Sequence, residues 1–259
     1  MADEVNFKVE GGVAKITINR PSAYNAMKIE MWASMLRFVQ DIEHVPEIRV
    51  LVLAGAGRHF CSGADVNELA QMLDMSPQGL AAHYMRQADI INPLFVTLER
   101  IPQPVIASVR GIAAGGGLGL VAGSDLIVAS ATARFFAAQV RLGAIPDSAV
   151  SFNLQRAIGI KKAKQYCLLG DEMDAPTAMG LGLVNWVVPD AELEAETDKL
   201  AARLERMPAI AMARTKATLN RSFKNSLTDH FLDEAQDVGD CVAQPDFAGN
   251  VRAFVDRKR

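Results

Sequence analysis

Two glycine-containing segments hold the residues whose types and spacing could support chemistry: residues 59–66 (HFCSGADV) and residues 110–119 (RGIAAGGGLG). Each follows an apolar, strand-like run, so each turn can present bare backbone N–H groups to a ligand. Two such turns side by side can place two donors on one carbonyl oxygen, the arrangement that stabilises an oxyanion or an enolate. The apolar stretch 118–122 is typical of a helix, whose positive end would point at the same oxygen.

The glycine triplet at 115–117 has two other interpretations. It can serve tight packing of a helix on a sheet, because glycine permits close backbone approach. It can also belong to a dinucleotide-binding turn, since Gly117, Gly119 and Ala122 fit the pattern G-x-G-x-x-A. That pattern expects an acidic residue about 20 residues further on, and residues 126–146 contain none. We therefore reject a nucleotide cofactor of that kind.

Composition limits the class of protein. The 27 basic and 30 acidic residues give a net charge of −3, which argues against a nucleic-acid partner. Cys61, Cys167 and Cys241 are too widely spaced for a disulfide framework or a metal site. The first residues lack the apolar segment of a signal peptide, and no apolar run is long enough to span a membrane. We expect a cytoplasmic protein without a membrane or nucleic-acid partner.

The elements that must position the two turns follow from hydrophobic periodicity. Strands are expected at 5–10, 13–19, 49–53, 105–109 and 126–129, the first two forming a hairpin around Gly11-Gly12. Ser76-Pro77 should open a helix that Pro93 interrupts or kinks. Further helices are expected at 28–44, 118–122, 191–207, 209–220, 227–242 and 247–255. Alternating strands and helices followed by helices alone predict an α/β protein with a C-terminal helical segment.

Taken in order, the two turns resemble the two oxyanion-hole segments of the crotonase (enoyl-CoA hydratase/isomerase) superfamily. The likeness extends to blocks at 12–27, 142–156, 178–188 and 251–259. It implies a crotonase-type spiral of repeated ββα units over residues 1–190, with an acyl-CoA site, and a C-terminal helical trimerisation segment over residues 191–259. It also implies self-association to a trimer or hexamer, and no cofactor, because the coenzyme A thioester is the substrate carrier.

The resemblance also implies site residues. The N–H groups of Ala64 and Gly116 should hold the thioester oxygen, and the CoA adenine should lie near the first turn. Phe254 and Lys258 should reach the nucleotide from the tail, within one chain or across a subunit interface. Cationic candidates for phosphate pairing are Arg20, Lys28 and Arg58. The full set of expected substrate-binding residues is Ser62, Gly63, Asp65, Val66, Asn67, Asn92, Gly115, Gln139, Phe254 and Lys258.

The carboxylates distinguish the possible reactions. Family hydratases carry glutamates at two positions that are Gly119 and Gln139 in this chain. Asp147 remains as a catalytic candidate, since its string LGAIPD is similar to that of the dienoyl-CoA isomerases and the phenylacetate-pathway epoxide isomerases. Otherwise it is a helix N-cap for residues 150–158. Its apolar flanks could bury it and raise its pKa.

A 4-chlorobenzoyl-CoA dehalogenase also has an aspartate at this position, but it adds a tryptophan and a histidine where this chain has Gln139 and Asn92. The pattern therefore favours a single-aspartate acyl-CoA isomerase. Two alternatives stay open: a hydratase or thioester hydrolase using water held by Gln139 or Asn92, and a weakly catalytic acyl-CoA- or RNA-binding relative.

Cys61 could act as a nucleophile with His59 as its base, although a buried structural cysteine is the expected role.

Overall fold

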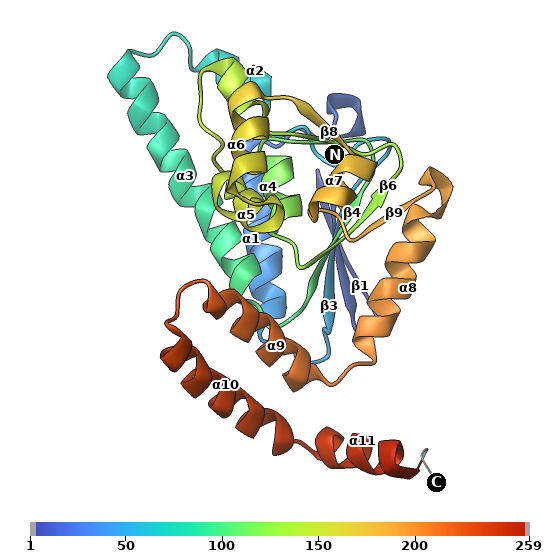
Figure 1. Cartoon of the computed structure of the whole chain (residues 1–259). Coiled ribbons are helices and arrows are strands. Elements are labelled where there is room, and N and C mark those ends of the chain that lie inside the picture. The colour runs from blue at the N-terminus through green and yellow to red at the C-terminus, as the bar shows by residue number, and fades with distance from the viewer. Residues whose placement is uncertain (1–3, 257–259) are drawn as a thin grey trace.

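The computed structural model describes residues 4–256, apart from the side chain of Ala138. Its centre is a six-stranded sheet in the order β1-β2-β3-β4-β6-β9, beside a three-stranded sheet in the order β5-β7-β8 (Figure 1). The strands are β1 Val5–Glu10, β2 Val13–Ile18, β3 Val50–Gly55, β4 Val105–Val109, β5 Ile112–Ala114, β6 Leu126–Ser130, β7 Arg134–Phe136, β8 Glu172–Asp174 and β9 Trp186–Val188.

The large sheet begins as a hairpin and continues as parallel strands. β1 and β2 pair antiparallel across the turn at Gly11-Gly12, which confirms the predicted hairpin. β2, β3, β4, β6 and β9 then pair parallel in turn. All five residues of β4 are buried, as expected for a parallel strand covered on both faces. The carboxyl ends of β3 and β4, where the two glycine turns begin, therefore lie at the same edge.

Successive chain segments alternate between the two sheets. β4 belongs to the large sheet and β5 to the small one, and α4 follows; β6 and β7 repeat this order, with β7 parallel to β5. Cys61 extends the small layer, because it forms a parallel bridge with Ala113 of β5. Each repeat stacks on the one before it, so the chain winds as a spiral of strand–strand–helix units.

Helices cover the two faces of the large sheet (Figure 1). Leu51 and Leu53 of β3 face the core that contains α1, whereas Val50 and Val52 pack against α8.

α3 begins with Ser76 as its N-cap and continues without interruption through Pro93, so the predicted break is absent. The helices are α1 Ile29–Glu43, α2 Val66–Gln71, α3 Pro77–Arg100, α4 Gly116–Ala122, α5 Val150–Ile158, α6 Ile160–Leu169, α7 Ala175–Leu181, α8 Leu193–Glu205, α9 Ala209–Ser222, α10 Leu227–Val242 and α11 Pro245–Asp256.

The C-terminal helices α9–α11 form an arm that projects from the core (Figure 1). The Lys216 ammonium anchors α9: it donates to the carbonyls of Leu98 and Gln103 at 2.9 and 3.1 Å, and it pairs with Asp125 at 2.8 Å. α8 packs instead on strands of the large sheet. The projecting part therefore begins after α8. Within residues 4–256, no helix has the length and apolar character needed to cross a bilayer.

Candidate active site

Cys61 joins the two glycine turns. Its N–H donates to the Ile112 carbonyl at 3.0 Å, and its own carbonyl accepts from the Ala114 N–H at 2.9 Å. The next residue of the second turn, Gly115, donates to Phe136 at 3.1 Å. Met27 also holds the first turn: its N–H donates to the Gly63 carbonyl, and its carbonyl accepts from the Asp65 N–H, on either side of Ala64. Strand-type hydrogen bonds thus hold both turns in fixed register.

These hydrogen bonds make residues 61–65 and 112–116 a backbone frame. The frame leaves two backbone N–H donors unused. Met27 takes up the Gly63 carbonyl and the Asp65 N–H, so the peptide N–H of Ala64 points to the other side. Gly116 is the first residue of α4, where an N–H has no partner within the helix. Among the hydrogen bonds of the described residues, none uses the Ala64 or the Gly116 N–H. Two free donors beside each other can stabilise an oxyanion.

Glycine is required where the turns meet. A Cβ built on Gly117 would lie 2.3 Å from the Cys61 carbonyl oxygen, which no side chain tolerates. Gly63 has φ +96° and its built Cβ would lie 3.5 Å from the Gly115 Cα. Gly115 itself has φ +51°, a conformation that glycine adopts readily. The triplet therefore provides the close approach of the two turns.

Asp65 stabilises the first turn from behind. Its carboxylate caps α2 by accepting from the Asn67 N–H at 2.9 Å, and it pairs with the Arg20 guanidinium at 2.8 Å. Burial alone would raise the pKa of Asp65, but the hydrogen bonds from Arg20 and Asn67 and the Arg20 charge outweigh it, so the pKa lies below its ordinary value. The side chains of Arg20 and Asp65 thus bind each other and stabilise the fold. Any substrate contact by Asp65 would involve its backbone.

Asp147 lies on a turn with unusual backbone geometry. Ser148 and Ala149, the two residues after it, have φ of 50° and 60°. The N-cap of α5 is Ala149, and the Val150 N–H bonds to the Asp147 backbone carbonyl, not to its carboxylate. The capping alternative is therefore wrong. The Asp147 carboxylate instead accepts from the Gln139 side-chain amide, with Nε2 and Oδ1 3.3 Å apart.

The surroundings of Asp147 differ from the expected apolar burial. Leu142 and Ile145 are 74% and 77% exposed, and the aspartate is exposed as well. The expectation that these flanks bury Asp147 is thus wrong for the single chain. Tyr84 of α3 is a neighbour that the sequence did not reveal: burial, and then the Asp147 charge, raise the pKa of its phenol. The phenol therefore lies close enough to the carboxylate to be affected by its charge.

The turn after Asp147 fills the place where a family hydratase carries its first glutamate. A Cβ built on Gly119 would lie 2.0 Å from the Ser148 carbonyl oxygen and 3.3 Å from the Phe95 ring. Ser148 itself is only 9% exposed. No side chain fits on Gly119 while the turn keeps this position. Backbone thus occupies the space beside Gly119.

Comparison with known proteins agrees with this geometry. The family model described as "Enoyl-CoA hydratase/isomerase" matches residues 8–259. The chain belongs to this family. It is 34% identical to the 1,2-epoxyphenylacetyl-CoA isomerase of Escherichia coli, over 96% of this chain and 94% of that one. It is 31% identical to the short-chain-enoyl-CoA hydratase of Clostridium acetobutylicum, over 99% and 96% of the two chains.

Solved structures of the family share the fold. A crystal structure of an enoyl-CoA hydratase/isomerase from Cupriavidus metallidurans superposes with a TM-score of 0.91 at 30% identity, covering 98% of this chain and 94% of the other. The crotonase fold expected from the sequence is thereby confirmed. The chain is an enzyme of the enoyl-CoA hydratase/isomerase family, which implies an acyl-CoA substrate.

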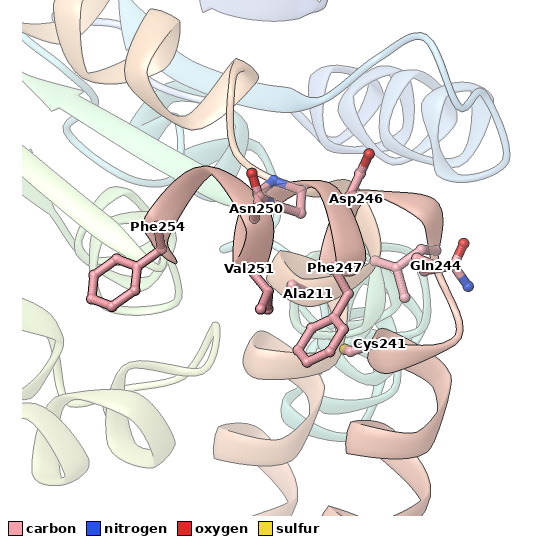
Figure 2. A pocket seen from close by; sticks show the side chains of 10 residues that line it. Ala211, Cys241, Gln244, Asp246, Phe247, Asn250, Val251 and Phe254 are labelled. Carbon is pink, nitrogen blue, oxygen red and sulfur yellow. The ribbon is translucent and has the colours of Figure 1, made fainter. Parts of the chain in front are cut away.

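Other expected site residues lie apart from the two turns. Asn92 is exposed on α3, and no hydrogen bond among the described residues joins it to Asp147. Phe254 is on α11, at the other end of the molecule from α4 (Figure 1). It lines a groove of about 330 Å³ together with side chains from α9, α10 and α11, including Cys241, Phe247 and Val251 (Figure 2). Lys258 lies outside the described residues.

The remaining predicted residues are placed as follows. Ser62, Gly63, Val66 and Asn67 belong to the first turn and the start of α2. Val66 and Asn67 are exposed there and accessible to a ligand. Of the three phosphate candidates, Lys28 pairs with Glu4 at 2.6 Å, Arg20 is committed to Asp65, and Arg58 is exposed.

Cys61 and His59 do not form a nucleophile and base. Burial raises the pKa of the Cys61 thiol to about 12. Burial, and then the Arg58 charge, lower the pKa of His59, and its Nδ1 accepts from the Ile112 N–H at 3.2 Å. A neutral imidazole bound to the backbone cannot take a proton from a buried thiol. Cys61 is therefore structural, as the sequence favoured.

Proposed function

We propose that this protein is an acyl-CoA isomerase that moves a double bond, or a ring-derived unsaturation, along the acyl group. The thioester oxygen accepts hydrogen bonds from the Ala64 and Gly116 N–H groups. Asp147 takes a proton from the acidified carbon, and the C–H electron pair moves toward the thioester oxygen to form an enolate. The protonated Asp147 returns the proton to another carbon, so substrate and product have equal mass.

The observation that carries this proposal is the loss of both hydratase carboxylates. Hydration needs one group to activate water and another to handle the α-proton. Gly119 has no room for any side chain because Ser148 occupies it, and the second position holds Gln139. A single carboxylate, Asp147, bonds to Gln139 beside the glycine triplet. One carboxylate suffices to move one proton between two carbons.

The names of relatives are compatible with either reaction. One is named a 1,2-epoxyphenylacetyl-CoA isomerase, and another is named a short-chain-enoyl-CoA hydratase. Near Asp147, the exposed apolar side chains Leu142 and Ile145 and the aromatic Tyr84 provide a surface for an apolar acyl group. These side chains support an unsaturated or ring-derived acyl chain as substrate.

A substrate panel in deuterium oxide tests the proposal. The panel contains 3-enoyl-, 3,5-dienoyl-, crotonyl- and aromatic acyl-CoAs, with products read by mass spectrometry. We expect deuterium incorporation and a shifted double bond without addition of water. Crotonyl-CoA hydration at an ordinary enzymatic rate, about 10 s⁻¹ or more, would contradict it.

Gln139 favours a second candidate, a thioester hydrolase or a weak hydratase. Its Oε1 is buried and lacks a hydrogen-bond partner within the described residues, so it could accept from a bound water. The same panel separates this function: hydrolysis releases free CoA thiol, and hydration adds the mass of one water molecule. Isomerisation does neither.

We also propose that the arm α9–α11 mediates self-association into a trimer or hexamer. α10 and α11 carry a row of exposed apolar side chains, whereas monomers seldom expose large contiguous apolar patches. Those side chains are Leu227, Phe231, Leu232, Val238, Val242, Phe247, Val251, Phe254 and Val255. Such an interface is also the way in which Phe254 could reach the nucleotide of another subunit. Sedimentation of the intact protein and of a Phe231→Asp variant tests this; a wild-type monomer would contradict it.

A further inference from the structure

Gln139 lies between the two parts of the proposed site. It belongs to the short 3₁₀ helix Ala138–Leu142, which follows β7. Its Nε2 is 3.3 Å from the Asp147 Oδ1, and it would be 3.8 Å from a Cβ built on Gly115. The amide thus contacts the carboxylate proposed to transfer the proton and lies near the residue that precedes the Gly116 donor.

The chemistry of the pair fixes the orientation of the amide. An ionised carboxylate only accepts hydrogen bonds, so the NH₂ end of Gln139 must face Asp147. The opposite end, Oε1, is then turned into the protein, where it is buried without a partner among the described residues. A buried acceptor without a partner is unfavourable. The unpaired Oε1 therefore argues against fold stability as the reason for a glutamine at position 139.

We propose that Gln139 is a positioning residue for the proposed isomerase: it holds Asp147 through Oδ1 and leaves Oδ2 to take and return the substrate proton. Asp147 needs such a partner because it is exposed and lies on a turn. A fixed carboxylate meets the substrate carbon in one geometry, which proton transfer requires.

A glutamate at this position would act differently. Two carboxylates in hydrogen-bond contact cannot both ionise readily, so they would share a proton. Gln139 offers the same shape with a donor and no charge. Tyr84 of α3 is a titratable group near Asp147, and it stays neutral because burial, and then the Asp147 charge, raise the pKa of its phenol.

Two substitutions test the proposal. Gln139→Met keeps the volume and removes the donor; we expect kcat to fall about tenfold, the worth of one hydrogen bond, with KM nearly unchanged. Gln139→Glu should also lower kcat, because a second carboxylate beside Asp147 would share its proton. Neither folding nor thermal stability should decrease in Gln139→Met, since it removes an unsatisfied acceptor.

A matched control is available on α10, where Gln236 donates to Asp240 at 3.0 Å. Gln236→Met removes the same kind of bond and should leave kcat and KM unchanged. A double-mutant cycle completes the test. If Gln139 acts through Asp147, then Gln139→Met should cost nothing further in the Asp147→Asn background. An equal loss in both backgrounds, or no loss in either, overturns the proposal.

Failure of the proposed function can be recognised separately. Full activity of Asp147→Asn would refute the proton-transfer role, whatever Gln139 does. The Asp147–Gln139 contact can then be measured without substrate, from the carboxylate stretching band of Asp147 in the difference infrared spectrum of the protein and Asp147→Asn. We expect this band to change in frequency in Gln139→Met, because the carboxylate loses a hydrogen-bond donor. An unchanged band means that Gln139 does not hold the carboxylate.

Discussion

The two parts of the candidate site are built differently. The glycine turns are fixed by backbone hydrogen bonds through Cys61 and Met27, and Asp65 secures them from behind. The Asp147 turn is exposed, and one side-chain amide holds the carboxylate. The difference agrees with the proposed division of work, in which the backbone of the glycine turns would stabilise an enolate and the carboxylate on the exposed turn would transfer the proton. One scaffold can then support several reactions in this family.

The exposed turn carries the largest expected effect. Asp147→Asn should reduce the isomerase rate by about 10²–10⁴, the usual worth of general acid–base catalysis. Stability should change little, because the Asp147 carboxylate does not cap α5. Rates per folded molecule and thermal unfolding are measured together, with the exposed Asp171→Asn, between α6 and β8, as control. A rate loss that merely follows a loss of folded protein would show that Asp147 is structural.

The frame is tested by removing one donor. Gly116→Pro deletes the N–H and should lower kcat by about 10²–10³. A Cβ at this position also meets Trp32 at 2.8 Å, so the substitution disturbs packing. Gly116→Ala introduces the same contact and keeps the N–H, which makes it the matched control. Equal activity of the two variants would show that the donor is not used.

The contact between frame and turn predicts a loss of stability. Gly119→Glu places a side chain against the Ser148 carbonyl and should destabilise the protein by about 3 kcal/mol, as overpacking does. It should not create a hydratase, because the glutamate cannot take its position unless the turn moves. Gly180→Glu on α7 is the control, since nothing lies within 4 Å of its built Cβ. Efficient crotonyl-CoA hydration by Gly119→Glu would refute the steric argument.

The Asp65–Arg20 ion pair behind the frame should make the free energy of unfolding depend on pH. Asp65→Asn keeps a capping group but loses the Arg20 ion pair, and should cost about 1–2 kcal/mol near neutral pH. Because the folded-state pKa of Asp65 is lowered, its stabilisation is present above the unfolded-state value and disappears as the pH falls through the folded-state value. Denaturant unfolding of both proteins should therefore differ at neutral pH and converge in acid. A difference independent of pH would mean that the charge is irrelevant.

The smallest effect concerns the buried thiol. Burial raises the pKa of Cys61 to about 12, so almost no thiolate forms at mildly alkaline pH. Iodoacetamide should modify the partly buried Cys167 and Cys241 first, and should reach Cys61 only after unfolding. Peptide mapping by mass spectrometry measures this. Early labelling of Cys61 would show that the frame opens.

Local sequence patterns predicted most elements, since the hairpin, α1 and the C-terminal helices follow from periodicity and turn residues. They also identified the turns, because glycine clusters after apolar strands are a local signal. They could not reveal that Ser148 fills the space beside Gly119, which requires left-handed backbone at two non-glycine residues. Tyr84 was missed because its place near Asp147 depends on how α3 packs. The exposure of Asp147 likewise depends on packing, not on its neighbours in sequence.

Exchange of substrate protons with solvent tests the central claim most directly. A 3-enoyl-CoA is incubated in deuterium oxide with wild type, Gly116→Pro and Asp147→Asn, and deuterium at the carbons of the acyl chain is followed by NMR. Wild type should incorporate deuterium as the double bond moves, and each variant should be slowed by at least about 10². Exchange at the wild-type rate in folded Asp147→Asn would contradict the assignment of proton transfer to the exposed turn.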